Sequence, residues 1–250
     1  MSDAPTEIVD ELTLWMRAMA GGTRGLLAGL TRIRVEGALD AIPPDGPAIV
    51  AVNHASNLDP VVLASVVMPK LGRRLQWLGK KELFAWPIVG WIARNGGVHP
   101  VDRASADVEA FRLAKRILDE GHLLLVFPEG TRSRDGRLQD ARDGTAVLAL
   151  RTGAPIIPIG IAGSFGVWPR GQKIPHPGGR VTVRIGTPFR LDDEIPVGTD
   201  RKAAKGLATE LIMRRIADLL PPEQRGRYGD IQPSSAPEPE AEGSIGDPVP

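Results

Sequence analysis

One short segment brings together side chains that could move a proton. Residues 53–59 read Asn-His-Ala-Ser-Asn-Leu-Asp and follow an apolar run that predicts a buried strand. A histidine such as His54 is the side chain best suited to accept a proton from an alcohol near neutral pH. A carboxylate five residues later, Asp59, could bond the second ring nitrogen and stabilise the imidazolium. His54 and Asp59 are therefore candidates for a general base and its partner.

The same pair also has a purely structural interpretation. Asp59 stands immediately before Pro60, where a helix is expected to begin, and an aspartate at that place commonly caps the helix. His54 would then be an ordinary structural histidine. The two roles are compatible, because one carboxylate oxygen can cap the helix while the other faces the imidazole.

A second segment contains the groups that usually bind a phosphate. Residues 127–133 read Phe-Pro-Glu-Gly-Thr-Arg-Ser and directly follow a predicted strand. A turn at Gly130 would expose backbone N–H groups, Thr131 supplies a hydroxyl, and Arg132 supplies a forked cation. The alternative is a surface turn with solvated arginines.

A third segment supplies further cations. Seven basic residues fall between positions 70 and 103, against two acidic ones. Lys80 and Arg103 each follow a predicted strand, so both could converge on an anion near His54 if their strands share its sheet. Arg73, in contrast, is expected on a solvated face.

The composition is that of a folded domain with a slight excess of positive charge. The chain has 250 residues, of which 42% are hydrophobic and 24% charged. The absence of cysteine excludes disulfides and a cysteine nucleophile, and the four histidines show no metal-ligand spacing, so no metal is expected. The first 220 residues carry a net charge of +5 and the last 30 a net charge of −4. This suits an anionic small molecule or lipid surface and argues against nucleic acid.

Hydrophobic periodicity predicts strands that alternate with helices. Strands are expected at residues 48–52, 76–79, 123–127, 155–161 and 180–185, and helices at 60–68, 104–120, 145–151 and 201–220. This order predicts an α/β domain with a largely buried sheet. In such domains ligands gather at the ends of strands, which is where the first two segments lie.

The N-terminal segment, residues 1–34, predicts an amphipathic helix. Apolar side chains at positions 8, 12, 15, 16 and 19 share one face of a helix over residues 7–20. The Gly21-Gly22 pair is expected to end this helix, and a second short helix is expected to follow. The stripe fits two interpretations, a helix packed on the domain or an interfacial membrane anchor with Trp and Met toward lipid.

The rest of the chain divides into a domain at residues 35–220 and a tail at residues 221–250. The tail is acidic and Pro-rich with almost nothing apolar to bury, so we expect it to be disordered. No secretory signal is visible, and no uncharged apolar run approaches the roughly 18–20 residues of a membrane span. Any membrane contact is therefore expected to be peripheral.

Taken together, these segments resemble the glycerolipid acyltransferases, and most closely the bacterial 1-acylglycerol-3-phosphate acyltransferases. The matching pieces are NHASNLD at 53–59, KKELFAWPIVGWIARNGGVHPVDR at 80–103, FPEGTRS at 127–133 and APIIPIGI at 154–161. Four motifs in the family's order are far more specific than any one of them. One departure is Arg142-Asp143-Gly144, where many relatives have an aromatic-lysine-glycine triplet.

The resemblance implies a mixed, largely buried sheet flanked by helices and an enzyme that acylates a lipid. It implies transfer of a fatty acyl group from an acyl thioester, on coenzyme A or acyl carrier protein, to 1-acylglycerol-3-phosphate, which gives phosphatidic acid. His54 would be the general base and Asp59 its partner. The acceptor phosphate would be bound by Lys80, Arg103, Glu129, Gly130, Thr131 and Arg132, and the donor site would be bound or shaped by Pro155 and Pro158.

The resemblance also bears on cofactors and location. The family forms no covalent acyl-enzyme and needs no metal or cofactor. The protein would act as a peripheral protein at the cytoplasmic face of the plasma membrane, with no transmembrane helix and no nucleic-acid partner.

Two alternatives stay open. The same chemistry could use another acceptor, such as glycerol-3-phosphate, a lyso-ornithine lipid or a glycosylated phosphoinositide. The non-catalytic alternative is a peripheral membrane protein that binds anionic lipids through the basic segment and the N-terminal helix. A pure binder, however, has no need for a His–Asp pair at the end of a strand.

Overall fold

A seven-stranded sheet forms the centre of the molecule in the part of the chain that the computed structural model describes, residues 8–101 and 106–229. The strand order is β1-β7-β6-β2-β5-β3-β4. The strands are β1 (Arg32–Gly37), β2 (Ala48–Val52), β3 (Leu75–Lys80), β4 (Val98–Val101), β5 (Leu123–Val126), β6 (Ile156–Ala162) and β7 (Arg180–Ile185). The helices are α1 (Leu14–Leu30), α2 (Asp59–Val62), α3 (Met68–Leu71), α4 (Pro87–Asn95), α5 (Ala106–Asp119), α6 (Gly144–Thr152), α7 (Ser164–Val167), α8 (Leu191–Glu194) and α9 (Arg201–Ala217).

The directions of the strands place the predicted motifs on one edge of the sheet. The strands β6, β2, β5, β3 and β4 are mutually parallel, whereas β7 is antiparallel to β6 and β1 is parallel to β7. The C-terminal ends of those five strands therefore share an edge with the starts of β7 and β1, and we call it the motif edge. The expected mixed sheet is confirmed.

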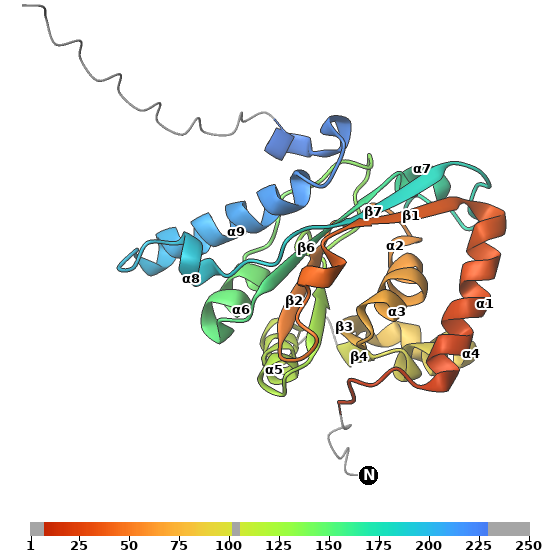
Figure 1. Cartoon of the computed structure of the whole chain (residues 1–250), viewed down its shortest axis with the longest axis horizontal. Helices are drawn as coiled ribbons and strands as arrows, with labels where there is room; N and C mark the ends of the chain where they lie inside the picture. The colour runs from red at the N-terminus through yellow and green to blue at the C-terminus, as the bar shows by residue number, and fades with distance from the viewer. Residues whose placement is uncertain (1–7, 102–105, 230–250) are drawn as a thin grey trace, which may run out of the picture.

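Helices cover both faces of the sheet. In Figure 1, α1, α2 and α3 lie on one side, and α5, α6, α8 and α9 lie on the other. Every residue of β2 and of β6 is buried. These central strands are nearly continuous apolar runs, as expected for strands that are covered on both faces.

Most predicted elements are present, and their bounds agree to within three residues when α2, the π-helical turn at Leu63–Val67 and α3 are taken together as the helix expected at 60–68. The strand β1 was not predicted, because residues 32–34 were assigned to the N-terminal helical segment. β1 pairs with β7 along its whole length. The expected boundary between residues 34 and 35 therefore cuts through the sheet and is wrong.

The N-terminal helix differs from the prediction at both ends. It begins at Leu14, where the Thr13 hydroxyl accepts the Met16 N–H, and it continues through Gly21-Gly22 to Leu30. The glycines of α1 face open space, while Met16, Ala20 and Leu27 are buried. A glycine costs a helix roughly 1 kcal/mol relative to alanine. Burial of the opposite stripe against the sheet and the α2–α3 segment outweighs this cost.

Residues 8–12, which we call the N-terminal strap, have no regular secondary structure and are not helical. Ile8 and Leu12 are buried at the two ends of the strap. Between them the Asp10 carbonyl accepts the Arg74 N–H at 2.9 Å, next to the start of β3. The strap therefore crosses the edge of the sheet that lies opposite the motif edge.

Arg73 fastens this strap and is not on a solvated face as predicted. It is 6% exposed, and its Nε donates to Asp10 Oδ2 at 2.8 Å. The other two guanidinium nitrogens donate to the carbonyls of Gly46 and Gly121, at 2.8 and 2.9 Å. Three partners from separate segments explain why a buried arginine is tolerated here.

The folded part of the chain extends past the expected start of the tail. Residues 221–229 form short 3₁₀ turns in which Tyr228 is 6% exposed. The Leu138 N–H donates to the Gln224 carbonyl at 2.8 Å, so this segment packs against the chain that follows β5. The prediction of disorder is wrong for these nine residues, and residues 230–250 lie outside the described part of the chain.

Replacing Arg73 by Met should destabilise the protein. The substitution leaves the Asp10 carboxylate and two partly buried carbonyls without their donor, which should lower the free energy of unfolding by about 3 kcal/mol. Urea denaturation measures this change. Arg201→Met, at an exposed arginine of α9, should stay within about 0.5 kcal/mol of the unsubstituted protein. An Arg73→Met protein as stable as this control would contradict the role assigned to Arg73.

Candidate active site

The predicted His–Asp pair is formed at the motif edge, directly after β2. His54 Nδ1 lies 3.0 Å from Asp59 Oδ2. The aspartate side chain is fully buried, and the histidine side chain is 15% exposed. A carboxylate beside Nδ1 favours the tautomer in which Nδ1–H donates. The lone pair of Nε2 is then available, and no residue in the described part of the chain bonds this atom.

Asp59 has a structural role as well, but not as a cap of the helix that follows. It is the first residue of α2, and the residue at the cap, Leu58, makes no side-chain bond. Asp59 Oδ2 instead accepts the N–H groups of Ala55 and Ser56, at 2.8 and 2.7 Å. The same oxygen that orients the imidazole therefore closes the turn that carries it.

The second motif holds His54 by its backbone on both sides. The His54 N–H donates to Glu129 Oε1 at 2.6 Å, and the His54 carbonyl accepts the Ser133 N–H at 2.7 Å. The imidazole stacks on the Phe127 ring, with 4.0 Å between centroids and 18° between planes. Residues 127–133 thus fix the position of His54 before any substrate binds.

Glu129 points into the protein and away from solvent. It is 3% exposed, and its second oxygen, Oε2, accepts the Gln139 N–H at 2.9 Å. Burial raises the pKa of Glu129; its two N–H donors lower it and the negative charges of Asp59 and Asp135 raise it, and the net result is a pKa of about 7. These contacts make Glu129 a link between the His54 turn and the chain after β5. No signal within the motif itself predicts this link, because His54 lies 75 positions away.

The rest of the motif forms an exposed turn. Gly130 has φ of +66° and donates its N–H to the Phe127 carbonyl at 2.9 Å. Thr131 is exposed and Arg132 is half-buried. A positive φ strains any residue with a Cβ, which explains the glycine at this position.

The other predicted site residues are less closely grouped. Lys80 ends β3 on the motif edge and is exposed. Arg103 lies outside the described residues. Pro155 precedes β6 at the opposite edge, and Pro158 is buried inside β6 beside Ala51. The structure therefore does not bring the two prolines to the His54 turn.

Three polar residues of the first motif have positions that the sequence analysis missed. The Asn53 amide bonds both the N–H and the carbonyl of Ile161 in β6, at 2.7 and 3.0 Å. Ser56 Oγ and the Asn57 N–H both donate to the Trp168 carbonyl, at 2.7 and 3.0 Å. These residues attach β6 and the loop after α7 to the His54 turn. The sequence signal for these contacts was that all three residues belong to the quoted motif.

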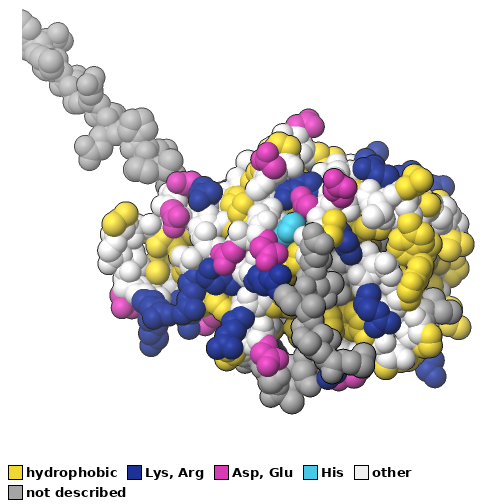
Figure 2. Space-filling view, turned by 90° about the horizontal axis from the view of Figure 1, so that it is seen from below, with side chains coloured by type: hydrophobic (Ala, Val, Ile, Leu, Met, Phe, Trp, Pro, Cys, Tyr) yellow, Lys and Arg dark blue, Asp and Glu magenta, His cyan; other side chains and the backbone are white. Residues whose placement is uncertain are grey.

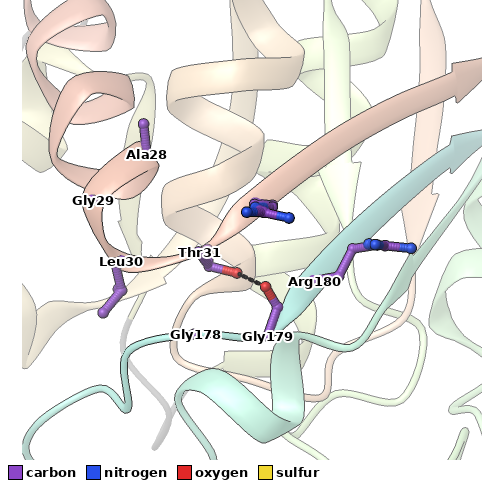
Figure 3. A pocket seen from close by; sticks show the side chains of 8 residues that line it. Ala28, Gly29, Leu30, Thr31, Gly178, Gly179 and Arg180 are labelled. Carbon is purple, nitrogen blue, oxygen red and sulfur yellow. Dashed lines mark hydrogen bonds between the residues drawn. The ribbon is translucent and has the colours of Figure 1, made fainter.

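An open hollow of about 540 Å³ lies elsewhere on the motif edge, beside the end of α1 (Figure 3). It is lined by residues 28–32 and 178–180, and Arg32 and Arg180 lie side by side at the starts of β1 and β7. None of the predicted site residues lines it. Within the described residues, no three His, Asp or Glu side chains are grouped closely enough to hold a metal ion.

Replacing Glu129 by Gln should change how stability depends on pH. Because the pKa of Glu129 is about 7 in the folded protein and lower when unfolded, the folded protein holds the proton between about pH 4.5 and 7 and loses stability as the pH rises. Relative to Glu129→Gln, the unsubstituted protein should lose up to about 1.4 kcal/mol per pH unit across this window. Urea denaturation at several pH values measures the difference, and parallel curves would contradict the raised pKa.

Comparisons with known proteins identify the family of this chain. The sequence profile of the family described as Acyltransferase matches residues 32–162, which is more than half of the chain. A chloroplastic 1-acyl-sn-glycerol-3-phosphate acyltransferase of Arabidopsis thaliana is 33% identical over 160 residues, which are 63% of this chain and 44% of the plant protein. A 1-acyl-sn-glycerol-3-phosphate acyltransferase of Pseudomonas aeruginosa is 26% identical over 216 residues, 85% of this chain and 76% of its own length.

A solved structure shows the same fold. The 1-acyl-sn-glycerophosphate (LPA) acyltransferase PlsC of Thermotoga maritima superposes with a TM-score of 0.65 at 26% identity, covering 82% of this chain and 79% of PlsC. The chain spans less than half the length of the plant relatives from Arabidopsis thaliana and Brassica napus. The profile match and the shared fold lead to one conclusion, that this chain belongs to the Acyltransferase family.

Proposed function

We propose that the protein transfers a fatty acyl group from an acyl thioester to the free hydroxyl of 1-acylglycerol-3-phosphate, which yields phosphatidic acid. The observation that carries the proposal is the His54–Asp59 pair, held at the motif edge next to the exposed Gly130–Thr131–Arg132 turn. The pair supplies a base, and the turn supplies donors for a phosphate. The relatives named for this activity support the choice of acceptor.

In the proposed reaction, His54 acts as a general base. Its Nε2 takes the proton of the acceptor hydroxyl while the hydroxyl oxygen attacks the thioester carbonyl. The tetrahedral intermediate then expels the thiolate, which takes the proton back from Nε2. Asp59 stabilises the imidazolium between these two steps, and general-base help of this kind contributes about 10²–10⁴-fold to a rate.

The second motif supports the same reaction by position. Arg132 would bind the acceptor phosphate and so fix the hydroxyl beside His54, and such positioning can remove several kcal/mol of the barrier. The acyl group would arrive on coenzyme A or acyl carrier protein. The bonds that break are the O–H bond of the acceptor and the C–S bond of the thioester, and those that form are the ester bond and the S–H bond of the thiol. The proposed reaction therefore requires no cofactor.

We further propose that the protein works at a membrane surface, at the cytoplasmic face of the plasma membrane. No helix in the described residues is long and apolar enough to cross a bilayer. Large apolar side chains are nevertheless exposed on α1 and beside it, Leu14 (84%), Leu26 (79%), Trp86 (68%) and Trp91 (49%). Figure 2 shows hydrophobic side chains gathered at the end of the molecule formed by α1 and α4.

The helices α1 and α4 contribute jointly to this surface. The Trp15 ring meets the Trp91 ring edge to face, with 4.6 Å between centroids. Tryptophan and leucine on one face of a surface helix are typical of interfacial membrane binding. Ile8, Leu12 and Met16 of the predicted N-terminal stripe are buried, so the stripe packs on the domain. The exposed leucines of α1 lie outside that stripe.

Replacing His54 by Ala should remove activity without unfolding the protein. We expect turnover to fall by about 10²–10⁴-fold, because the base is lost, while the KM for 1-acylglycerol-3-phosphate changes little. Thiol release from an acyl-CoA, with a panel of phosphorylated and neutral lyso-lipid acceptors, measures both values. Thermal unfolding checks the fold. A His54→Ala enzyme at near the unsubstituted rate would refute the mechanism.

Placing charge on the exposed apolar surface should weaken membrane binding. Leu26→Glu combined with Trp86→Glu should reduce binding to vesicles of anionic phospholipid by tenfold or more, because two apolar side chains no longer enter the bilayer interface. Val197 is fully exposed between α8 and α9, away from this surface, so Val197→Glu is the matched control. Equal co-sedimentation of both variants with vesicles would exclude α1 and α4 as the binding surface.

A further inference from the structure

Two arginines without a carboxylate partner line the hollow beside the end of α1. Arg32 and Arg180 are paired in register at the starts of β1 and β7, so their side chains leave the sheet on the same face. Both residues are exposed. In the part of the chain that the structure describes, neither guanidinium forms an ion pair. Two adjacent cations repel one another unless an anion lies between them.

The same face of β1 and β7 carries further positive charge. Arg34 and Arg184 share a single carboxylate, that of Glu36, at 3.4 and 3.3 Å. The segment that follows α9 covers Arg184, whose Nη1 donates to the Leu219 carbonyl at 3.1 Å. Four arginines therefore share this face with one glutamate, and the two that lack a partner lie at its motif-edge end.

The wall of the hollow has room for a ligand larger than a single phosphate. Apart from the arginines and Leu30, small residues and exposed backbone form this wall (Figure 3). One of them, Gly29, lies inside α1, where a glycine is unfavourable, and a Cβ at this position would meet nothing within 4 Å. The volume of about 540 Å³ is in the range of pockets that bind small organic molecules.

The hollow and His54 lie at the same edge of the sheet. The strand β1 lies three strands away from β2, which corresponds to about 14 Å. The loop after α7 spans this interval. Near His54 its Trp168 carbonyl accepts the Asn57 N–H at 3.0 Å, and at the hollow the Gly178 N–H donates to the Leu30 carbonyl at 2.7 Å. A ligand held by the two arginines can therefore reach the base only through an arm of about this length.

Coenzyme A has this form. Its nucleotide carries a diphosphate and a 3′-phosphate, whose oxygens match the N–H fork of a guanidinium. Its thioester is at the far end of a pantetheine arm, whose backbone is about as long as that of four residues and so spans about 14 Å when extended. The prosthetic arm of acyl carrier protein, in contrast, ends in one phosphodiester and has no nucleotide to occupy a hollow of this volume.

We propose that the hollow binds the phosphorylated nucleotide of coenzyme A between Arg32 and Arg180, so that the acyl donor is an acyl-CoA. The pantetheine arm then crosses the loop after α7 and brings the thioester to His54. The inference rests on the proposed function and extends it, because it assigns the donor and its site to residues outside the quoted motifs. It also gives Gly29 a role, which is to leave room for the nucleotide.

Kinetics of arginine variants test the charge of this site. Arg32→Gln and Arg180→Gln should each raise the KM for acyl-CoA by about tenfold, because a charged hydrogen bond to a phosphate is lost. The KM for 1-acylglycerol-3-phosphate should stay unchanged, and Arg180→Lys should recover part of the loss. With acyl-pantetheine, a donor without phosphate, the variants and the unsubstituted enzyme should behave alike. Arg201→Gln, at an exposed arginine of α9, is the matched control and should change neither KM.

A larger side chain at Gly29 tests the volume of the site. Gly29→Gln should raise the KM for acyl-CoA by about tenfold and also raise the Tm, because glutamine favours a helix more than glycine does. Gly22→Gln makes the same change at an exposed glycine of α1 that does not line the hollow. It should raise the Tm in the same way and leave the KM for acyl-CoA unchanged. Equal KM values for the two glycine variants would contradict the site.

Three results would overturn the inference while the proposed function stands. They are transfer from acyl-CoA with an unchanged KM in both arginine variants, transfer from acyl carrier protein but not from acyl-CoA, and a loss of binding to anionic vesicles in the arginine variants without a change in the KM for acyl-CoA. The last result would assign the two arginines to lipid headgroups.

Calorimetric binding of coenzyme A separates the inference from the proposed function. A protein without transferase activity on 1-acylglycerol-3-phosphate, whose binding of coenzyme A weakens in both arginine variants, would refute the function and support the site. Absence of both activity and binding would refute both.

Discussion

The hydrogen bonds that join residues 127–133 to His54 determine how the candidate site is organised. The two segments follow neighbouring parallel strands, β2 and β5, and they meet through the backbone of the histidine. The buried Glu129 side chain accepts the His54 N–H, and the Ser133 N–H donates to the His54 carbonyl. Asp59 orients the ring and also closes the turn that carries it. Two backbone hydrogen bonds, the bond to Asp59 and the stacking on Phe127 therefore fix the base before a substrate arrives, as expected of a preorganised site.

The topology of the sheet explains why distant motifs can cooperate. Five parallel strands end where two strands of opposite direction begin, so loops from every part of the domain reach one edge. The first motif contributes the base and also holds the loop after α7 through Ser56 and Asn57. The second motif contributes the turn and also holds the base. Each motif thus supports the structure of the other. Both motifs therefore contain polar residues that have no part in the proposed reaction.

Local signals in the sequence were sufficient for the central strands of the sheet and for the His54–Asp59 pair, but not for β1. A spacing of five residues across a turn is enough to predict that the two side chains can meet, and apolar runs mark the buried strands. Contacts between distant segments were not predictable. Arg73 is buried because Gly46, Gly121 and the N-terminal strap all supply acceptors, and the inward orientation of Glu129 depends on His54 and Gln139. Likewise, α1 tolerates its glycines only because its other face is buried.

The attachment of α1 to the sheet constrains how the protein could approach a lipid surface. Arg73 and Arg74 hold the strap before the helix, and after it the chain enters β1 almost at once, where the Thr31 hydroxyl bonds the Gly179 carbonyl at 3.2 Å. A helix fastened at both ends has no hinge about which to swing. If α1 rests on a bilayer, the distance from the lipid headgroups to His54 is consequently constant. A lipid acceptor would then have to rise from the bilayer by that fixed height to be acylated, while its hydrocarbon chain could remain partly among its neighbours.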